Sequence, residues 1–215
     1  MTDQPLRIDI VSDVVCPWCI VGFTQLRTAL HEVGVQADIH WHPFELNPDM
    51  PPEGENLRDH IMCKYGSTAE QSRRARADLV DLGTDLGIPF VFTEDSRIVN
   101  TFEAHQLLHW SAQGGRQTDL KLALFDAYFR QGRDVSDRAV LLDAAEAAGL
   151  DRADAEAALS DPRLPEAVRE KEEFWIARGI RGVPAMIFGR QHLVTGAQGI
   201  EGYRRVLDHL ASNAA

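Results

Sequence analysis

Two cysteines, Cys16 and Cys19, stand where a strand pattern gives way to a helix pattern. Before them, apolar and polar residues alternate over residues 6–10, which is typical of a strand. After them, apolar residues recur at helical spacing up to Val33, and Gly34 is well suited to end the helix. A chain in which a strand leads directly into a helix through a Cys-x-x-Cys pair can adopt few folds.

A second alternating pattern over residues 35–41, ended by Pro43, completes a strand–helix–strand unit. Such connections place the two strands parallel, with the helix on one face of the sheet. Strand patterns return only in residues 184–188 and 192–196, which a closing helix follows. We therefore expect a βαβ half and a ββα half that join into one sheet.

The segment between these halves changes character after an irregular stretch, "PFELNPDMPPEGEN". It then carries patterns for five or six helices. Three of these helices are expected to begin at the capping residues Thr68, Asp137 and Asp151. We predict an α/β fold divided over residues 1–48 and 179–215, with an all-α insertion domain at residues 49–178.

Acidic residues outnumber basic residues by 33 to 22, which gives a formal charge of −11. Because this charge repels phosphate backbones and anionic lipids, neither nucleic acid nor a membrane surface is expected as a partner. No apolar run reaches the roughly 18 residues that cross a bilayer, and the N-terminus carries no secretory signal pattern. We expect a cytoplasmic protein. In that reducing compartment, a disulfide is expected to be transient and functional.

A redox role requires two thiols close enough to bond, one of them exposed and acidic. Cys16 meets this requirement if it lies at the helix start, where free N–H groups and the helix dipole stabilise a thiolate. Cys19, one turn further on, would be shielded and placed to resolve a mixed disulfide. Pro17 suits the first helical position because it has no N–H to leave unsatisfied. We therefore expect a bare Cys16 sulfur whose pKa lies below that of a free cysteine.

Two other interpretations of the pair remain open. His60 and Cys63 in "HIMC" could complete a four-ligand zinc set with Cys16 and Cys19, although 40 residues separate the pairs. The two cysteines could also serve as small core residues. Cys63 by itself is expected to be such a small core residue, and no metal is predicted.

Several stretches resemble one known family: "SDVVCPWC", "PFELNPDMPPEG", "KYG", "GIPF", "NTFEAHQLLHWS", "GVPAMIFG" and "GAQGIEGY". Together they resemble the DsbA-like branch of the thioredoxin superfamily, and more narrowly the FrnE-type thiol oxidoreductases. The resemblance spans nearly the whole chain. It implies a thioredoxin-like fold with a helical insertion and a redox-active Cys-x-x-Cys centre.

The resemblance also implies that Val183–Pro184 is a cis peptide bond beside the active cysteines, a geometry that X-Pro bonds can adopt at small cost. The Val183 backbone could then pair with an extended peptide or with glutathione. Many strongly oxidising relatives carry histidine at the position of Trp18, so we expect a less oxidising couple here. Trp18 and Pro17 are candidate substrate contacts.

Asn100 and His105 lie in a segment that resembles the "NTxxAH" motif of 2-hydroxychromene-2-carboxylate isomerases and kappa-class glutathione transferases. In those relatives the cleft between the domains holds glutathione. Asn100 could contact such a ligand or cap a helix, whereas His105, flanked by apolar residues, is expected to be a core residue.

The leading functional hypothesis is a dithiol–disulfide oxidoreductase that exchanges disulfides with protein or low-molecular-weight thiols through Cys16 and Cys19. It requires no tightly bound cofactor, although glutathione could be a co-substrate, and a homodimer is compatible with the sequence. The alternative is a glutathione-dependent isomerase or transferase of the 2-hydroxychromene-2-carboxylate isomerase or kappa type. A third hypothesis is a non-enzymatic adaptor whose helical domain binds a partner and whose cysteines are unreactive. The presence of Cys19 favours the first, because only dithiol exchange needs a resolving thiol.

Overall fold

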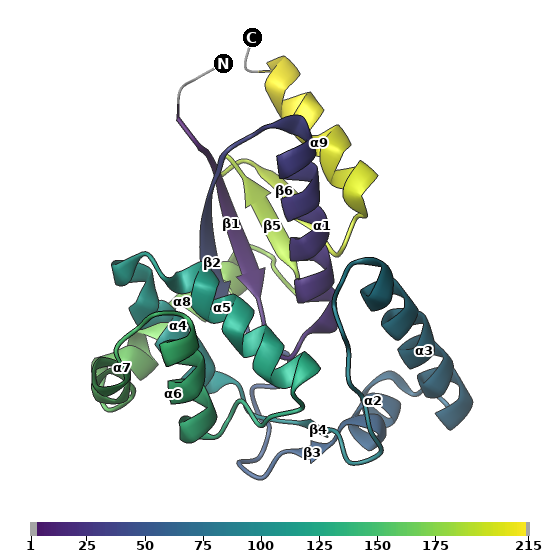
Figure 1. Cartoon of the computed structure of the whole chain (residues 1–215), viewed down its shortest axis with the longest axis vertical. Coiled ribbons are helices and arrows are strands. Elements are labelled where there is room, and N and C mark those ends of the chain that lie inside the picture. The colour runs from purple at the N-terminus through teal and green to yellow at the C-terminus, as the bar shows by residue number, and fades with distance from the viewer. Residues whose placement is uncertain (1–3, 214–215) are drawn as a thin grey trace.

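The computed structural model describes residues 4–213, which are organised around a four-stranded sheet with the order β2-β1-β5-β6 (Figure 1). The N-terminal strands β1 (Leu6–Ser12) and β2 (Ala37–Pro43) are parallel. The C-terminal strands β5 (Ala185–Phe188) and β6 (His192–Thr195) form an antiparallel hairpin. Strand β5 pairs antiparallel with β1, so the two ends of the chain share one sheet. The predicted joining of a βαβ half and a ββα half is confirmed.

Helices α1 (Pro17–Val33) and α9 (Ile200–Asn213) pack against each other and lie on the same side of the sheet (Figure 1). Gly34 ends α1 as expected, because its φ of 68° is a left-handed conformation that glycine adopts readily. Gly22 lets α1 approach the sheet closely. A methyl group at that position would lie 3.3 Å from Pro184 Cγ and 3.2 Å from the Tyr203 hydroxyl.

The segment between the sheet halves contains seven α-helices within the described residues. They are α2 (Leu57–Tyr65), α3 (Ala69–Asp85), α4 (Phe102–Ser111), α5 (Gln117–Phe125), α6 (Arg138–Ala147), α7 (Arg152–Leu159) and α8 (Arg163–Ala177). A 3₁₀ turn at Ala112–Gly114 follows α4, and a π-helical turn at Asp126–Arg130 follows α5. The caps at Thr68, Asp137 and Asp151 are confirmed by side-chain hydrogen bonds to the first turns. None of the described helices has the combined length and apolar character that a membrane crossing requires.

Helix α2 and a small second sheet were not expected. Strands β3 (Glu55–Asn56) and β4 (Arg97–Ile98) have only two residues each, too few to show an alternating pattern. Helix α2 begins at Asn56, whose side chain accepts a hydrogen bond from Asp59 N at 3.2 Å. None of its side chains is buried, so the sequence carries no apolar stripe to mark the helix. The insertion is thus mainly but not wholly α-helical.

Helices α4, α5 and α8 pack against edge strand β2, whereas α2 and α3 lie away from it (Figure 1). The central contact is Trp41 of β2, whose ring meets Phe23 of α1 at 4.7 Å and Phe125 of α5 at 6.3 Å between centroids. The Gln117 amide pairs with the backbone of Trp41, accepting from its N–H at 2.9 Å and donating to its carbonyl at 3.0 Å. The outer edge of β2 is therefore covered by α5, which fixes that helix relative to the sheet.

Candidate active site

The turn between β1 and α1 holds both cysteines of the pair as free thiols. Cys16 occupies the N-cap position of α1 with an extended backbone (φ −88°, ψ 112°), and Pro17 takes the first helical position as expected. The Cys19 N–H donates to the Cys16 carbonyl at 3.0 Å, so Cys19 lies one turn into the helix. Trp18, between the two thiols, is 49% exposed. The local sequence thus places Trp18 at the surface beside the pair.

The expectation of a bare Cys16 sulfur is wrong, because Cys16 is only 3% exposed and Cys19 is completely buried. The cause is the chain segment before β5, whose Val183 carbonyl accepts a hydrogen bond from the Cys16 thiol at 3.6 Å. A cavity of about 300 Å³ adjoins this segment and is lined by residues 179–184, Thr195 and Gly196. The cavity therefore borders the segment that covers the Cys16 thiol.

Val183 and Pro184 meet the cysteines from the opposite end of the chain. The peptide bond between them is cis, Pro184 is buried and Val183 is half-buried. The Pro184 carbonyl accepts from Gly196 N at 2.8 Å, which fixes the segment to the end of β6. Within residues 4–213 the Val183 N–H has no hydrogen-bond partner. It is a backbone donor available to a bound molecule.

The ionisations of the two thiols are linked, because charge on one sulfur opposes charge on the other. The interaction with Cys19, together with burial, raises the pKa of Cys16 well above its ordinary value. Burial also opposes ionisation of Cys19, but the interaction with Cys16, the charge of Lys121 and the nearby Ser12 outweigh it and lower the pKa of Cys19. The expected lowering of the Cys16 pKa is therefore wrong for the reduced pair, in which the lowered pKa is that of Cys19.

A buried carboxylate, Asp13, precedes the pair. Its Oδ1 accepts from Val14 N at 2.7 Å and lies 3.3 Å from Nε2 of His105, while its Oδ2 accepts from Leu46 N at 2.8 Å. Burial would raise the pKa of Asp13, but the His105 hydrogen bond and charge, the Leu46 N–H and the charge of Lys121 together lower it. His105 is buried on α4, so its predicted core position is confirmed. Asp13 is an ionised group held beneath the turn.

The most unusual charge in the site is that of Lys121 on α5, which is only 1% exposed. Its Nζ lies 3.5 Å from the Ser12 carbonyl, 4.9 Å from the ring centroid of Phe125 and 5.4 Å from that of Trp41. Burial lowers the pKa of Lys121 to about 8, although the charges of Cys19, Asp13 and Cys16 raise it.

The sequence analysis missed both Asp13 and Lys121 as site residues. The signal for Lys121 was present. The buried face of α5 carries Leu120, Leu124 and Phe125. Lys121 precedes Leu124 by three residues and Phe125 by four, so it lies on the same face of the helix. A buried lysine on an otherwise apolar face indicates a charged partner nearby.

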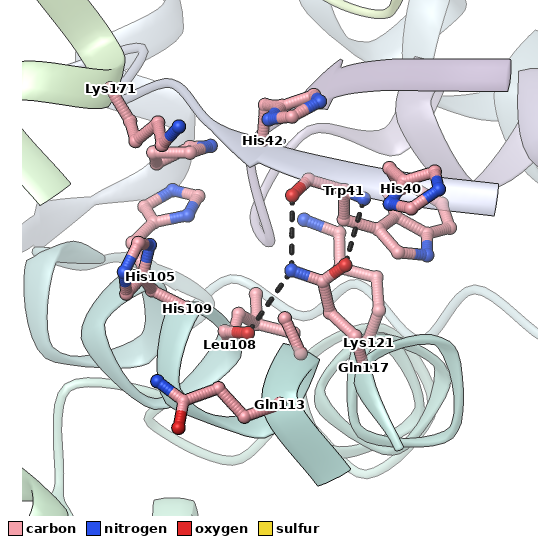
Figure 2. Close-up of a pocket in the computed structure, with 12 residues that line it drawn as sticks. His40, Trp41, His42, His105, Leu108, His109, Gln113, Gln117, Lys121 and Lys171 are labelled. Atoms are coloured by element: carbon pink, nitrogen blue, oxygen red, sulfur yellow. Dashed lines mark hydrogen bonds between the residues drawn. The ribbon is translucent and has the colours of Figure 1, made fainter. Parts of the chain in front are cut away.

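Lys121 also borders a cavity of about 220 Å³ between β2 and helices α4, α5 and α8 (Figure 2). Four of the eight histidines line this cavity, namely His40, His42, His105 and His109. His42 and His40 contact Asp9 and Asp38 at 2.8 and 2.7 Å. The sequence does not group these four residues, because they come from two elements, β2 and α4, that only the fold brings together.

The zinc interpretation is not supported by the positions of His60 and Cys63. The His60 ring contacts Glu55 at 2.6 Å and Asn47 at 3.0 Å. Cys63 is exposed on α2, so its expected position in the core is wrong. In the part of the chain that the structure describes, no three His, Cys, Asp or Glu side chains are arranged to hold a metal ion.

Asn100 lies just before α4 and uses both ends of its amide. Its Oδ1 accepts from Phe102 N at 2.9 Å, and its Nδ2 donates to the Met50 carbonyl at 3.3 Å. The side chain therefore caps α4, whereas Thr101 makes no such bond. No contact joins Asn100 to the cysteines, so a ligand contact there remains a prediction.

Comparison with known proteins gives the family. The chain matches the family described as DSBA-like thioredoxin domain over residues 7–208 and belongs to it. The uncharacterized protein YwbO of Bacillus subtilis (strain 168) is 25% identical over 203 residues, which cover 94% of this chain and 96% of YwbO. The crystal structure of the probable DsbA oxidoreductase SCO1869 from Streptomyces coelicolor matches with a TM-score of 0.86 and 31% identity, covering 95% of this chain and 89% of that chain.

Two more distant structures share the fold. The cytosolic disulfide reductase DsbM from Pseudomonas aeruginosa has a TM-score of 0.65 and 20% identity over 96% of this chain and 99% of its own. A 2-hydroxychromene-2-carboxylate isomerase has a TM-score of 0.69 and 19% identity over 97% of this chain and 98% of its own. The fold is therefore common to disulfide chemistry and to isomerisation, and the site has to distinguish between them.

Proposed function

We propose that this member of the DSBA-like thioredoxin family is a dithiol–disulfide oxidoreductase that uses Cys16 and Cys19 as its redox couple. One observation carries the proposal. The Cys16 thiol lies at the N-terminus of α1 and contacts the carbonyl of Val183 at 3.6 Å, and a second thiol, that of Cys19, lies one turn further into the helix. Two cysteines at this spacing at the start of a helix can form a disulfide.

The exchange proceeds in two steps, which we write in the direction that reduces a substrate. The Cys16 proton passes to the Cys19 thiolate. The Cys16 thiolate then attacks a substrate disulfide, and the departing substrate thiolate takes a proton from solvent. Next, Cys19 gives its proton to the solvent and attacks the Cys16 sulfur. The second substrate sulfur leaves as a thiolate, a Cys16–Cys19 disulfide forms, and two electrons have passed to the substrate.

The Val183 segment is the proposed substrate-binding edge. The unpaired Val183 N–H can donate to an extended peptide or to the backbone of glutathione, and its carbonyl becomes available once the Cys16 thiol has reacted. Exposed Trp18 and neighbouring Pro17 would contact the substrate from the other side of Cys16. Glutathione as co-substrate and a cytoplasmic location are in keeping with the cytosolic reductase DsbM, which has also been solved with GSH.

Replacing each cysteine in turn tests the proposal. In an insulin-reduction assay driven by dithiothreitol, Cys16→Ser should lower the protein-dependent rate to the background rate, because the attacking sulfur is gone. Cys19→Ser should accumulate mixed disulfides that non-reducing electrophoresis and mass spectrometry detect, because the resolving thiol is missing. Cys63→Ser is the matched control and should keep the wild-type rate, since Cys63 lies exposed on α2. A Cys16→Ser variant with undiminished activity would refute the proposal.

The same variants separate this function from that of a glutathione-dependent isomerase or transferase. This is the second candidate, because a 2-hydroxychromene-2-carboxylate isomerase shares the fold. Such an enzyme binds the glutathione thiol and needs no resolving cysteine. Full glutathione-dependent turnover of an isomerisable or electrophilic substrate by Cys19→Ser would favour the second candidate.

A further inference from the structure

We propose that Lys121, which the insertion supplies from α5, is the electrostatic partner of Cys19 and holds the negative charge of its thiolate in the reduced pair. This inference rests on the proposed function. The insertion would then help to set the reduction potential of the two cysteines at the start of α1.

The surroundings of Lys121 leave its charge incompletely compensated. The ammonium group has three N–H donors, and its one hydrogen bond in the described part of the chain goes to the Ser12 carbonyl at 3.5 Å. Aromatic rings of Trp41 and Phe125 surround it and hold the side chain in place. A buried ammonium group is costly unless a negative group lies close to it.

Asp13 is the only carboxylate among the charges that act on Lys121, and it is already engaged elsewhere. It accepts hydrogen bonds from Val14 and Leu46 and faces His105 at 3.3 Å. Within residues 4–213, no carboxylate forms an ion pair with Lys121 at salt-bridge distance. The remaining negative group is the Cys19 thiolate, with Cys16 beyond it on the same helix.

The groups that face Lys121 come from three directions. Cys16 and Cys19 act on it from the start of α1, and Asp13 acts on it from the turn after β1. His105 of α4 lines the same cavity as Lys121 (Figure 2). Tyr128, in the π-helical turn after α5, is buried and neutral, because burial and then the charge of Asp13 hold its pKa far above neutral pH. Lys121 is therefore the cation that acts on the inner sulfur.

The chemical consequence is a shift of the couple toward its dithiol form. When a substrate thiolate attacks Cys16 of the oxidised protein, the Cys16–Cys19 bond breaks and Cys19 leaves as a thiolate. The ammonium group of Lys121 stabilises that leaving thiolate, which makes the reduced state more favourable and the couple more oxidising. In the opposite direction, the same charge favours the loss of the Cys19 proton that precedes its attack on the mixed disulfide.

The test compares two neutral variants with a charge-retaining one. Lys121→Met keeps the length of the side chain, and Lys121→Gln keeps a hydrogen-bond donor for the Ser12 carbonyl. Two different neutral side chains are used so that misfolding of one variant does not prevent the test. In a glutathione redox buffer, both should shift the dithiol–disulfide equilibrium at least about tenfold toward the disulfide, which corresponds to a potential about 30 mV lower. The thiolate absorbance of both should also titrate at a higher pH than in the wild type.

Two controls identify the cause of that shift. Lys121→Arg keeps the charge and should stay closer to the wild-type equilibrium than either neutral variant. Lys171→Met removes a lysine charge from the rim of the same cavity and should stay within about twofold of the wild type.

The inference is overturned if both neutral variants keep the wild-type equilibrium and thiolate titration. In that case Cys19→Ser would still trap mixed disulfides, so the proposed function would stand. Absence of exchange in the wild-type protein would instead remove the function itself.

Discussion

Helices α4 and α5 belong to the same insertion as helices α2 and α3, but the first two pack directly against strand β2 of the sheet, whereas the other two lie away from it. Helix α4 buries six residues and α5 buries four, Lys121 among them. Helix α2 buries none and α3 buries three. The near half of the insertion, by which we mean α4 and α5, thus borders the candidate active site. The far half, α2 and α3, does not border it.

The far half contacts the near half mainly through the loop that follows α3. Gly83 of α3 packs against the following loop so closely that a methyl group there would lie 2.6 Å from the Ile88 carbonyl. Phe90 of that loop meets Phe129 edge-on at 5.2 Å, just after α5. Local opening of α2 and α3 is therefore expected to cost less free energy than opening of α4 and α5.

The largest difference is expected from core truncations in the two halves. Phe125→Ala on α5 removes a fully buried ring that contacts Trp41, and should lower the free energy of unfolding by about 3–5 kcal/mol. Ile61→Ala on α2 removes a half-buried side chain and should cost about 1 kcal/mol or less. Urea denaturation of both variants measures this. Equal losses would mean that the two halves are equally integrated.

A smaller difference concerns how stability depends on pH. Burial lowers the pKa of Lys121 to about 8 in the folded protein. Between pH 8 and about 10.4, the ordinary value for lysine, the unfolded chain therefore binds more protons at this site than the folded one. Its contribution to stability then rises with pH, by up to about 1.4 kcal/mol per pH unit.

Lys121→Met should lack this contribution, so wild-type stability should rise relative to that variant as the pH increases through this window. Lys64→Met on exposed α2 is the comparison, and its profile should run parallel to the wild type. Denaturation at a series of pH values gives all three curves. A parallel Lys121→Met profile would contradict the assignment of a strained buried charge.

The smallest effect is expected at the start of α3. Thr68 and Gln71 form a capping box, with Thr68 Oγ1 accepting from Gln71 N at 3.2 Å and Gln71 Oε1 accepting from Thr68 N at 2.8 Å. Thr68→Ala should destabilise the helix by about 1 kcal/mol and speed amide exchange in α3. The rate of insulin reduction should not change. A change in that rate would show that the far half communicates with the cysteines.

Local features were predictable because the signals lie within a few residues of one another. The Thr68 cap, the Gly34 stop and the strand–turn–helix around Cys16 each depend on near neighbours in the chain, and all three are present. Helix α2 was missed because its stability does not come from a buried face, so no periodic pattern marks it.

The site was predictable in its sulfurs but not in its electrostatics. A Cys-x-x-Cys pair at a helix start suggested an exposed and acidic outer thiol. The structure instead covers Cys16 with Val183, 167 residues away in the chain, and places the lowered pKa on Cys19. Burial and neighbouring charge determine a pKa, and both depend on segments that are distant in sequence.

By itself, the sequence determined which segments form the strands of the four-stranded sheet, where most helices begin, and that two sulfurs lie one turn apart, because backbone preferences and side-chain caps act locally. Only the tertiary structure decided which sulfur is shielded, which ions surround it and which half of the insertion takes part. The physical reason is that desolvation and Coulomb interactions depend on distance in space, and the distance between Lys121 and Cys19 is set by the packing of α5 on β2.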